Sequence, residues 1–294
     1  EESFKGLLEF NPHLNKVHVV NIKKIKKKKS LYLLYKELRG LRNFGPYDIV
    51  LDMQGLVKSA IISRCLPSKQ ILGFDKFSIR EKLASVFYNK TFNFSYNKNV
   101  VERNFKLIKF ALDLPLKFEE IGYKLPFLYS HKKKLSPCLS KTKKNIVLIP
   151  GASFATKCYP IENFAELTNL LNANYIVIWG SVEENLLAHK IKNLAPNVNV
   201  CEQLSIDSLI LLISQVDLVV GPDTGPTHMA WALNTPSITL FGPTPGYRNT
   251  CVTNINKIIE SDSNVNPLKI NKKDYSIKNI DAQEVCKVAE ILLN

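Results

Sequence analysis

The stretch from residue 217 to residue 242, DLVVGPDTGPTHMAWALNTPSITLFG, constrains the fold more than any other part of the chain. DLVVG is a short apolar run that ends in glycine, as expected of a buried parallel strand. Pro226 suits the first position of a helix, and Asn234-Thr235-Pro236 ends that helix before a second apolar strand, SITLF. The stretch therefore predicts strand, loop, helix and strand. The helix would begin at the edge of the sheet where open α/β sheets bind ligands.

The loop inside this stretch carries polar residues that suit an anion next to a sugar. Free N–H groups at a helix start favour an anion by roughly 0.3–1 kcal/mol. Asp223 is the exception, because a carboxylate repels phosphate, and we interpret it as a partner for sugar hydroxyls. The alternative is an ordinary capped helix start. The candidate residues are Asp223, Thr224, Gly225, Thr227 and His228.

Length and composition indicate a two-domain protein with sizeable cores. The chain has 294 residues, of which 45% are hydrophobic, and it contains no apolar run of the ~18 residues that a membrane-spanning helix needs. It begins with Glu instead of Met, so we expect further residues before it, and no signal peptide is visible. The six cysteines show no CxxC spacing, which favours free thiols of a cytosolic protein.

The positive charge is concentrated in the first half of the chain. Residues 1–144 hold 30 Lys and Arg against 12 Asp and Glu, whereas residues 145–294 hold 10 against 14. The run KKIKKKK, residues 23–29, is expected to be a solvated loop because like charges repel. A basic half indicates an acidic partner: nucleic acid, an anionic membrane surface or a phosphorylated substrate. A lysine-rich genome bias with solvated faces is the alternative.

Strands and helices alternate along both halves, which predicts an α/β fold with parallel sheets. The predicted strands of the first half are 17–22, 47–52 and 70–74, and its helices are 30–44, 56–66, 78–88 and 99–112. The predicted strands of the second half are 145–150, 175–180, 217–221 and 237–241, followed by a closing helix near the end of the chain. Residues 113–144 are irregular and form the predicted linker.

A candidate site in the first half follows the predicted strand at 47–52. The sequence DMQGLVKSA places Asp52, Gln54 and a glycine at the strand end, with Lys58 one turn into the next helix. A lysine at a helix start would attract phosphate or carboxylate. A glycine turn followed by a surface lysine fits the spacing equally well.

Two further strand ends in the second half carry candidate anion ligands. GASFATKCYP, residues 151–160, places Lys157 before a helix, and the helix after 175–180 begins with Glu183 and Glu184. A carboxylate after a strand commonly binds ribose, although acidic residues also complement a helix start. The Walker pattern and DxD are absent, and no GxGxxG follows the first strand. The loops together suit a nucleotide diphospho-sugar whose leaving diphosphate Lys157 stabilises without a metal.

These motifs resemble those of the bacterial lipopolysaccharide heptosyltransferases. DTGPTHMAWALNTPSITLFGPT is similar to the family's donor-site signature, a DTG followed by His and then by GPT after the next strand. DMQGLVKSA is similar to the D-x-Q-G-L-x-K-S-A segment typical of heptosyltransferase I, and ASFATKCYP resembles the family's hydroxyl-rich loop with a lysine. The resemblance covers nearly the whole chain, and the two signatures together are specific.

The resemblance implies a GT-B architecture, in which two Rossmann-like domains enclose a central cleft. It implies an acceptor-binding domain over residues 1–135, a donor-binding domain over 136–280, and a closing helix over 281–294 that could pack back on the first domain. The implied reaction moves L-glycero-D-manno-heptose from ADP-heptose to the Kdo of lipid A–Kdo, with inversion and without metal or cofactor. The enzyme would be a monomer, peripheral on the cytoplasmic face of the inner membrane, and would not bind nucleic acid.

The resemblance also implies roles for individual residues. Lys157 and Ser153 would contact the diphosphate or the heptose, Glu184 would hold the adenosine ribose, and Asp223 would bind heptose hydroxyls. The implied catalytic residues are Lys157, Asp223 and His228. The implied donor ligands are Ser153, Lys157, Glu184, Asp223, Thr224, Gly225, Thr227 and His228. The implied acceptor ligands are Asp52, Gln54, Lys58 and Arg80.

The sequence departs from the family's pattern in two places. The family begins with a strand and a Gly-Asp loop whose Asp is the general base, and this expected base lies before residue 1. Asp52 is not used as the base in the family, so we hypothesise that this chain binds the donor but transfers heptose only in the full protein. The second departure is Ser153-Phe154-Ala155, where relatives carry more hydroxyl and charged residues.

Three other functions fit parts of the sequence. A basic nucleic-acid-binding module would need aromatic residues among the lysines, and KKIKKKK has none. A sugar-nucleotide epimerase of GT-B type would need neither a lipid acceptor nor a basic half. A heptosyltransferase II, or an enzyme for another sugar, is the nearest alternative, and DMQGLVKSA weighs against it.

Overall fold

The computed structural model describes residues 1–132 and 138–294. Residues 133–137 of the predicted linker lie outside the described part of the chain. The described chain divides into two compact units: the first comprises Glu1–Lys5 and His18–Lys124, and the second Gly6–Val17 and Leu125–Asn294. The chain therefore passes from the first unit to the second after Lys124, earlier than the predicted boundary at residue 135.

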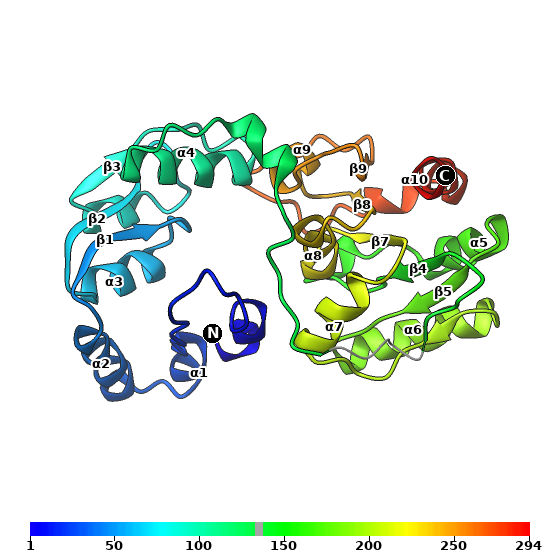
Figure 1. Cartoon of the computed structure of the whole chain (residues 1–294), viewed down its shortest axis with the longest axis horizontal. Coiled ribbons are helices and arrows are strands. Elements are labelled where there is room, and N and C mark those ends of the chain that lie inside the picture. The colour runs from blue at the N-terminus through cyan, green and yellow to red at the C-terminus, as the bar shows by residue number, and fades with distance from the viewer. Residues whose placement is uncertain (133–137) are drawn as a thin grey trace. The chain divides into compact units, whose positions relative to one another are not determined.

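The first unit contains a three-stranded parallel sheet in the order β1-β2-β3 (Figure 1). The strands are β1 (Tyr47–Asp52), β2 (Ser68–Phe74) and β3 (Lys90–Phe92). The α-helices are α1 (Ile22–Lys27), α2 (Leu31–Gly40), α3 (Val57–Cys65) and α4 (Val100–Leu112), and the 3₁₀ helices include η3 (Lys82–Phe87). The core of the unit is built from apolar side chains of α3, β2, η3 and α4, among them Ala60, Ile71, Phe74, Ala84 and Leu107.

Several predictions for the first unit are wrong. The expected strand at 17–22 is irregular up to residue 21, because a strand needs a hydrogen-bonded neighbour and the described strands offer none there. Residues 23–27 of the lysine run belong to α1 instead of a loop, and Ile25 of this helix lines a pocket with Leu33 and Phe44. The predicted helix at 78–88 is the shorter η3, and the three-residue strand β3 was not predicted.

The second unit contains a six-stranded sheet in the order β6-β5-β4-β7-β8-β9, and every pair is parallel (Figure 1). The strands are β4 (Asn145–Leu148), β5 (Asn174–Val177), β6 (Asn199–Val200), β7 (Leu218–Pro222), β8 (Ser237–Phe241) and β9 (Asn256–Glu260). The helices are α5 (Ile161–Leu170), α6 (Val182–Leu194), α7 (Ile206–Ile213), α8 (Gly225–Leu233), α9 (Gly246–Asn249) and α10 (Ala282–Leu293). The near-continuous apolar sequences of β4, β7 and β8 follow from burial on both faces.

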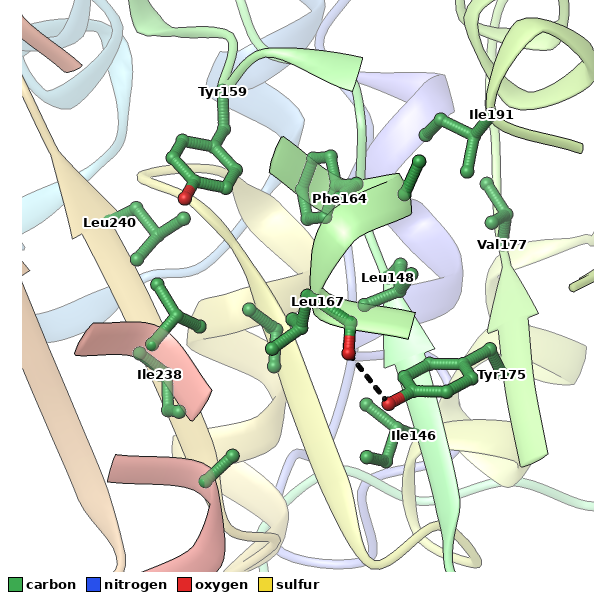
Figure 2. Close-up of a cluster of buried hydrophobic side chains, with 14 of the residues drawn as sticks. Ile146, Leu148, Tyr159, Phe164, Leu167, Tyr175, Val177, Ile191, Ile238 and Leu240 are labelled. Atoms are coloured by element: carbon green, nitrogen blue, oxygen red, sulfur yellow. Dashed lines mark hydrogen bonds between the residues drawn. The ribbon is translucent and has the colours of Figure 1, made fainter. Parts of the chain in front are cut away.

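Alternate residues of the central strand β4 face two separate cores. Ile146 and Leu148 pack with side chains of α5, α6 and α10, whereas Val147 and Ile149 pack with side chains of α7 and α8. Figure 2 shows the first of these cores, where the Tyr175 hydroxyl donates a hydrogen bond to the Leu167 carbonyl at 3.1 Å. Each fully buried aliphatic side chain contributes about 1.5–3 kcal/mol, so this sheet is a stable frame for its loops.

The closing helix α10 belongs to the second unit. It packs against α5 and places Val285 and Ala289, one turn apart, in the core that contains Ile146. Two residues before α10, the Ile280 carbonyl accepts a hydrogen bond from the Tyr159 hydroxyl at 2.9 Å, which also ties the start of the helix to the second unit. The expectation that residues 281–294 could also pack on the first domain stays a prediction.

Candidate active site

The strand order of the second unit creates a topological switch point between β4 and β7. From β4 the chain proceeds outward through β5 and β6, and from β7 it proceeds in the opposite direction through β8 and β9. A crevice forms outside the carboxyl ends of the strands at such a point, and α/β sheets bind ligands there. Ser153 and Lys157 follow β4, and the loop from Asp223 to His228 follows β7, so these predicted donor residues lie at the switch point, whereas Glu184 follows the neighbouring strand β5.

Asp223 is the centre of the site. Its Oδ2 atom accepts hydrogen bonds from Lys157 Nζ at 2.8 Å and from Thr244 Oγ1 at 3.1 Å. The same atom accepts from Asn249 Nδ2 at 3.2 Å, and Oδ1 lies 2.9 Å from His228 Nε2. The structure thus brings together the three predicted catalytic residues. Because Oδ2 is saturated, Oδ1 is the carboxylate atom with capacity for a further hydroxyl.

The ion pair between Lys157 and Asp223 is buried, with each residue only 8% exposed. Burial alone would raise the pKa of Asp223. The hydrogen bond from His228 and the positive charge of Lys157 lower this pKa by more than burial raises it, so that it lies well below its usual range. The His228 side chain is 40% exposed. The cluster therefore holds a fixed cation and an accessible imidazole at the end of β7.

The start of α8 is shaped by Thr227. The Thr227 hydroxyl donates to the carbonyls of Thr224, at 2.7 Å, and Pro222, at 3.1 Å, and it lies 3.3 Å from the Thr224 amide. Thr227 therefore holds the loop, and its hydroxyl is already engaged. Gly225 has open space beside its α-carbon, which allows a ligand to approach the helix N-terminus.

Glu184 connects two of the predicted loops. Its Oε2 accepts hydrogen bonds from the Gly180 amide at 2.7 Å and the Ser181 amide at 3.3 Å, so it caps α6. Its carboxyl group also packs on Gly151, where an added Cβ would lie 2.3 Å from it. The capping role anticipated as an alternative is thus present, and Oε1 lies over the loop that leads to Lys157. Ser153 in that loop is exposed.

Thr244 and Asn249 were not predicted as site residues. Both follow β8, and they complete the coordination of the Asp223 carboxylate. Arg248 donates a hydrogen bond to Asn249 Oδ1 at 3.2 Å, which orients the amide with its nitrogen toward Asp223. The sequence signal that could have indicated them is the rigid segment PTPG after a strand adjacent to β7.

In the first unit, Asp52 organises the strand end instead of facing a ligand. It is 4% exposed. Its Oδ1 accepts from the Gln54 amide at 2.9 Å, and its Oδ2 accepts from Ser59 Oγ at 2.8 Å and the Tyr88 hydroxyl at 2.7 Å. Burial, together with its own hydrogen bond to Asp52 and the negative charge of Asp52, raises the pKa of the Tyr88 hydroxyl. The Asp52 carboxylate is therefore committed to internal contacts, while the Gln54 side chain is exposed.

The other two predicted acceptor residues, Lys58 and Arg80, are exposed at the same end of this sheet. The segments that carry them are tied together by Glu81, whose Oε2 accepts from the Val57 amide at the start of α3 at 2.8 Å. Glu81 thus supplies the anion for this helix N-terminus. An additional anion bound at this end of the sheet would therefore contact the side chains of Lys58 and Arg80 and not the N-terminus of α3.

Arg103 of α4 is a buried arginine that fixes this loop. Its guanidinium donates to the carbonyls of Ser78 at 2.7 Å, Phe94 at 2.7 Å and Ser95 at 2.6 Å, and it stacks over the ring of Phe74. Hydrogen bonds to a charged group each contribute about 1.5–3 kcal/mol. Arg103 therefore positions the backbone from which Arg80 projects.

We expect Arg103→Lys to lower the free energy of unfolding by about 2–3 kcal/mol, because an ammonium cannot span the three carbonyls in this planar geometry. Urea denaturation measures the change. Arg80→Lys is the matched control, since the Arg80 side chain is 54% exposed, and it should leave stability unchanged. Equal stability of the two variants would contradict the positioning role of Arg103.

Comparisons with known proteins agree with this architecture. The description "Glycosyltransferase family 9 (heptosyltransferase)" matches residues 34–278. Lipopolysaccharide heptosyltransferase 1 of Campylobacter coli is 37% identical over 99% of this chain and 88% of the relative, and that of Pseudomonas aeruginosa is 30% identical over 84% and 70%. The solved structure of Escherichia coli heptosyltransferase WaaC with ADP superposes with a TM-score of 0.78 at 23% identity, covering 99% of this chain and 88% of that one.

Two parallel α/β units, one of them doubly wound with polar residues at its switch point, match the GT-B architecture of solved heptosyltransferases. The chain belongs to glycosyltransferase family 9, the heptosyltransferases. Among the described residues, no helix has the length and apolar character to cross a bilayer. Within the same residues, no group of three or more His, Cys, Asp or Glu side chains is placed to hold a metal ion.

Proposed function

We propose that this protein transfers L-glycero-D-manno-heptose from ADP-heptose to the Kdo of lipid A–Kdo, as a heptosyltransferase I. The observation that carries the proposal is the buried ion pair of Lys157 and Asp223 at the switch point, with the accessible His228 beside it. The similarity to two proteins named lipopolysaccharide heptosyltransferase 1, together with the DMQGLVKSA segment, supports type I. A related solved structure contains ADP-2-deoxy-2-fluoro heptose, which supports the donor.

The donor would lie across the loops at the carboxyl ends of β4, β5 and β7. Lys157 and the N-terminus of α8 would hold the diphosphate, with His228 beside it and Gly225 leaving room for close approach. Ser153 would contact the diphosphate or heptose. Glu184 would hold the ribose through Oε1, and the free capacity of Asp223 Oδ1 would bind a heptose hydroxyl.

The chemistry follows from charge placement. When the glycosidic bond to the diphosphate breaks, negative charge develops on the leaving oxygen, and the ammonium of Lys157 is already fixed beside it by Asp223. Attack by the acceptor hydroxyl from the opposite face inverts the anomeric centre. This arrangement needs no metal, because the lysine and the helix dipole supply the positive charge. The general base on the acceptor hydroxyl would be the Asp of the family's Gly-Asp loop.

The first unit would bind the acceptor. The exposed Lys58 and Arg80, with the Gln54 side chain, would face the carboxylates and phosphates of lipid A–Kdo. Asp52 would hold the backbone at the end of β1 by accepting the hydrogen bond from the Gln54 amide. A lipid acceptor requires a protein that works at the membrane surface, so we propose a peripheral monomer on the cytoplasmic face of the inner membrane.

Calorimetric titration tests the donor half of this proposal. We expect ADP-heptose to bind and UDP-glucose not to bind. Glu184→Gln should weaken ADP-heptose binding about tenfold. Glu183→Gln is the matched control: Glu183 is the exposed neighbour on the same turn, so this variant should bind ADP-heptose as tightly as the unsubstituted chain does. Binding of UDP-glucose with equal affinity, or of neither donor, would overturn the proposal.

A further inference from the structure

An exposed apolar surface lies at the carboxyl end of the first sheet, outside the groups used so far. Four large apolar side chains form it, with exposed fractions of 73% for Phe77, 61% for Leu83, 69% for Val86 and 45% for Met53. We call these four residues the apolar stripe. The core requires none of them, because Ile79 and Ala84 on the inner side fill it.

Local contacts bring together the segments that carry these four residues. Leu83 and Val86 lie three residues apart in η3, and residues i and i+3 of a 3₁₀ helix eclipse each other. An added Cβ on Gly55 would lie 2.5 Å from Ile79, so the loop that carries Met53 contacts the loop that carries Phe77.

The exposed charges around the apolar stripe are positive. Four exposed cations border it: Lys58, Lys76, Arg80 and Lys82. The nearby carboxylates are engaged: Asp75 accepts hydrogen bonds from Ser78 Oγ at 2.6 Å and Asn93 Nδ2 at 2.7 Å. Glu81 caps α3 through Oε2, and its Oε1 lies 3.7 Å from the guanidinium of Arg80, whose side chain stays 54% exposed. An apolar surface bordered by cations complements an anionic membrane interface, where apolar side chains enter the headgroup region and cations meet lipid phosphates.

We propose that the apolar stripe and its four bordering cations dock the first unit on an anionic phospholipid bilayer. The proposal deepens the proposed function and rests on it for the reason to dock, since Lys58 and Arg80 would then meet a lipid-borne acceptor at the bilayer surface. Membrane binding itself does not depend on catalysis. We favour a bilayer over a protein partner as the occupant of this surface. The surface consists of a short 3₁₀ helix and two loops, and its cations surround the apolar side chains without a pattern that would select one protein sequence.

Co-sedimentation with vesicles tests the docking surface. We expect the protein to bind vesicles of phosphatidylethanolamine and phosphatidylglycerol and to bind vesicles of phosphatidylcholine at least tenfold more weakly. Leu83→Asp combined with Val86→Asp should lower binding to the anionic vesicles at least tenfold. The matched control is Val182→Asp combined with Leu186→Asp, which changes an equally exposed pair on α6 of the second unit, and it should bind as the unsubstituted protein does.

Two further measurements keep the test decisive. Circular dichroism and ADP-heptose calorimetry should give wild-type results for the η3 variant, so that unfolding or a failed donor assignment is separated from lost docking. Equal vesicle binding by the η3 and α6 variants would overturn the proposal. So would binding to neither kind of vesicle, or dimerisation in solution that the η3 substitutions abolish, since the stripe would then contact a second copy.

Discussion

Replacing Asp223 with alanine is expected to lower the free energy of unfolding by about 3–5 kcal/mol, the typical cost of leaving a buried ion without its partner. The variant leaves the buried Lys157 ammonium without its carboxylate and removes the acceptor of Thr244, Asn249 and His228. Donor affinity should fall too, because neither Lys157 nor His228 is then held in position. Urea denaturation and ADP-heptose calorimetry measure the two effects.

The double variant Asp223→Ala, Lys157→Met separates these effects. Removing both charges leaves no unpaired ion, so much of the stability should return, whereas donor affinity should stay low. If the double variant were as unstable as the single one, the ion pair would not be the cause. The sign of the pH dependence gives a further check: the pKa of Asp223 is lower in the folded chain than its ordinary value of 3.8, so its stabilising contribution is full at neutral pH and is lost on acidification below about pH 4.

Replacing Lys157 with alanine is expected to reduce kcat/KM for heptose transfer about 10²–10³-fold, which corresponds to ~2.7–4 kcal/mol of transition-state stabilisation. The Lys157 ammonium is held 2.8 Å from Asp223 in a buried position, so it needs no reorganisation when the diphosphate leaves. Steady-state kinetics of the natural gene product with ADP-heptose measures the loss.

Lys272 provides the control for this prediction. Its Nζ lies 5.7 Å from the centre of the Phe154 ring, and Lys157 Nζ lies 5.6 Å from the same ring, but Lys272 is exposed. Lys272→Ala should therefore keep the activity of the unsubstituted enzyme. Unchanged kcat/KM in the Lys157 variant would refute its role in stabilising the leaving group.

The main features of the second unit could be predicted because its sequence signals are local. The helix predicted between Pro226 and Asn234 is α8: Pro226 is its second residue, and Asn234 follows its end in the left-handed conformation, which was not predicted. The short apolar strands on each side have lengths and compositions that define a buried parallel sheet.

Contacts between distant segments could not be predicted in the same way. Asn249 reaches Asp223 only because the loop after β8 folds toward the end of β7; the PTPG segment marks this loop, but it does not show which residue the loop brings to Asp223. Asp52 looked like a ligand because it ends a strand, but Tyr88, 36 residues away, occupies its carboxylate. The strand expected at 17–22 failed for a similar reason, since strand formation depends on a neighbour and not only on sequence.

The Asp223 cluster also has a consequence for fold specificity. Its members follow β4, β7 and β8, whose register pairs Leu148 with Val220 and Pro222 with Leu240. A slip of one residue along a parallel strand moves a loop by ~3.3 Å, more than the 2.8 Å that joins Lys157 to Asp223. A misregistered sheet would bury unpaired charges, so the ion pair between Lys157 and Asp223 also disfavours incorrect strand alignments during folding.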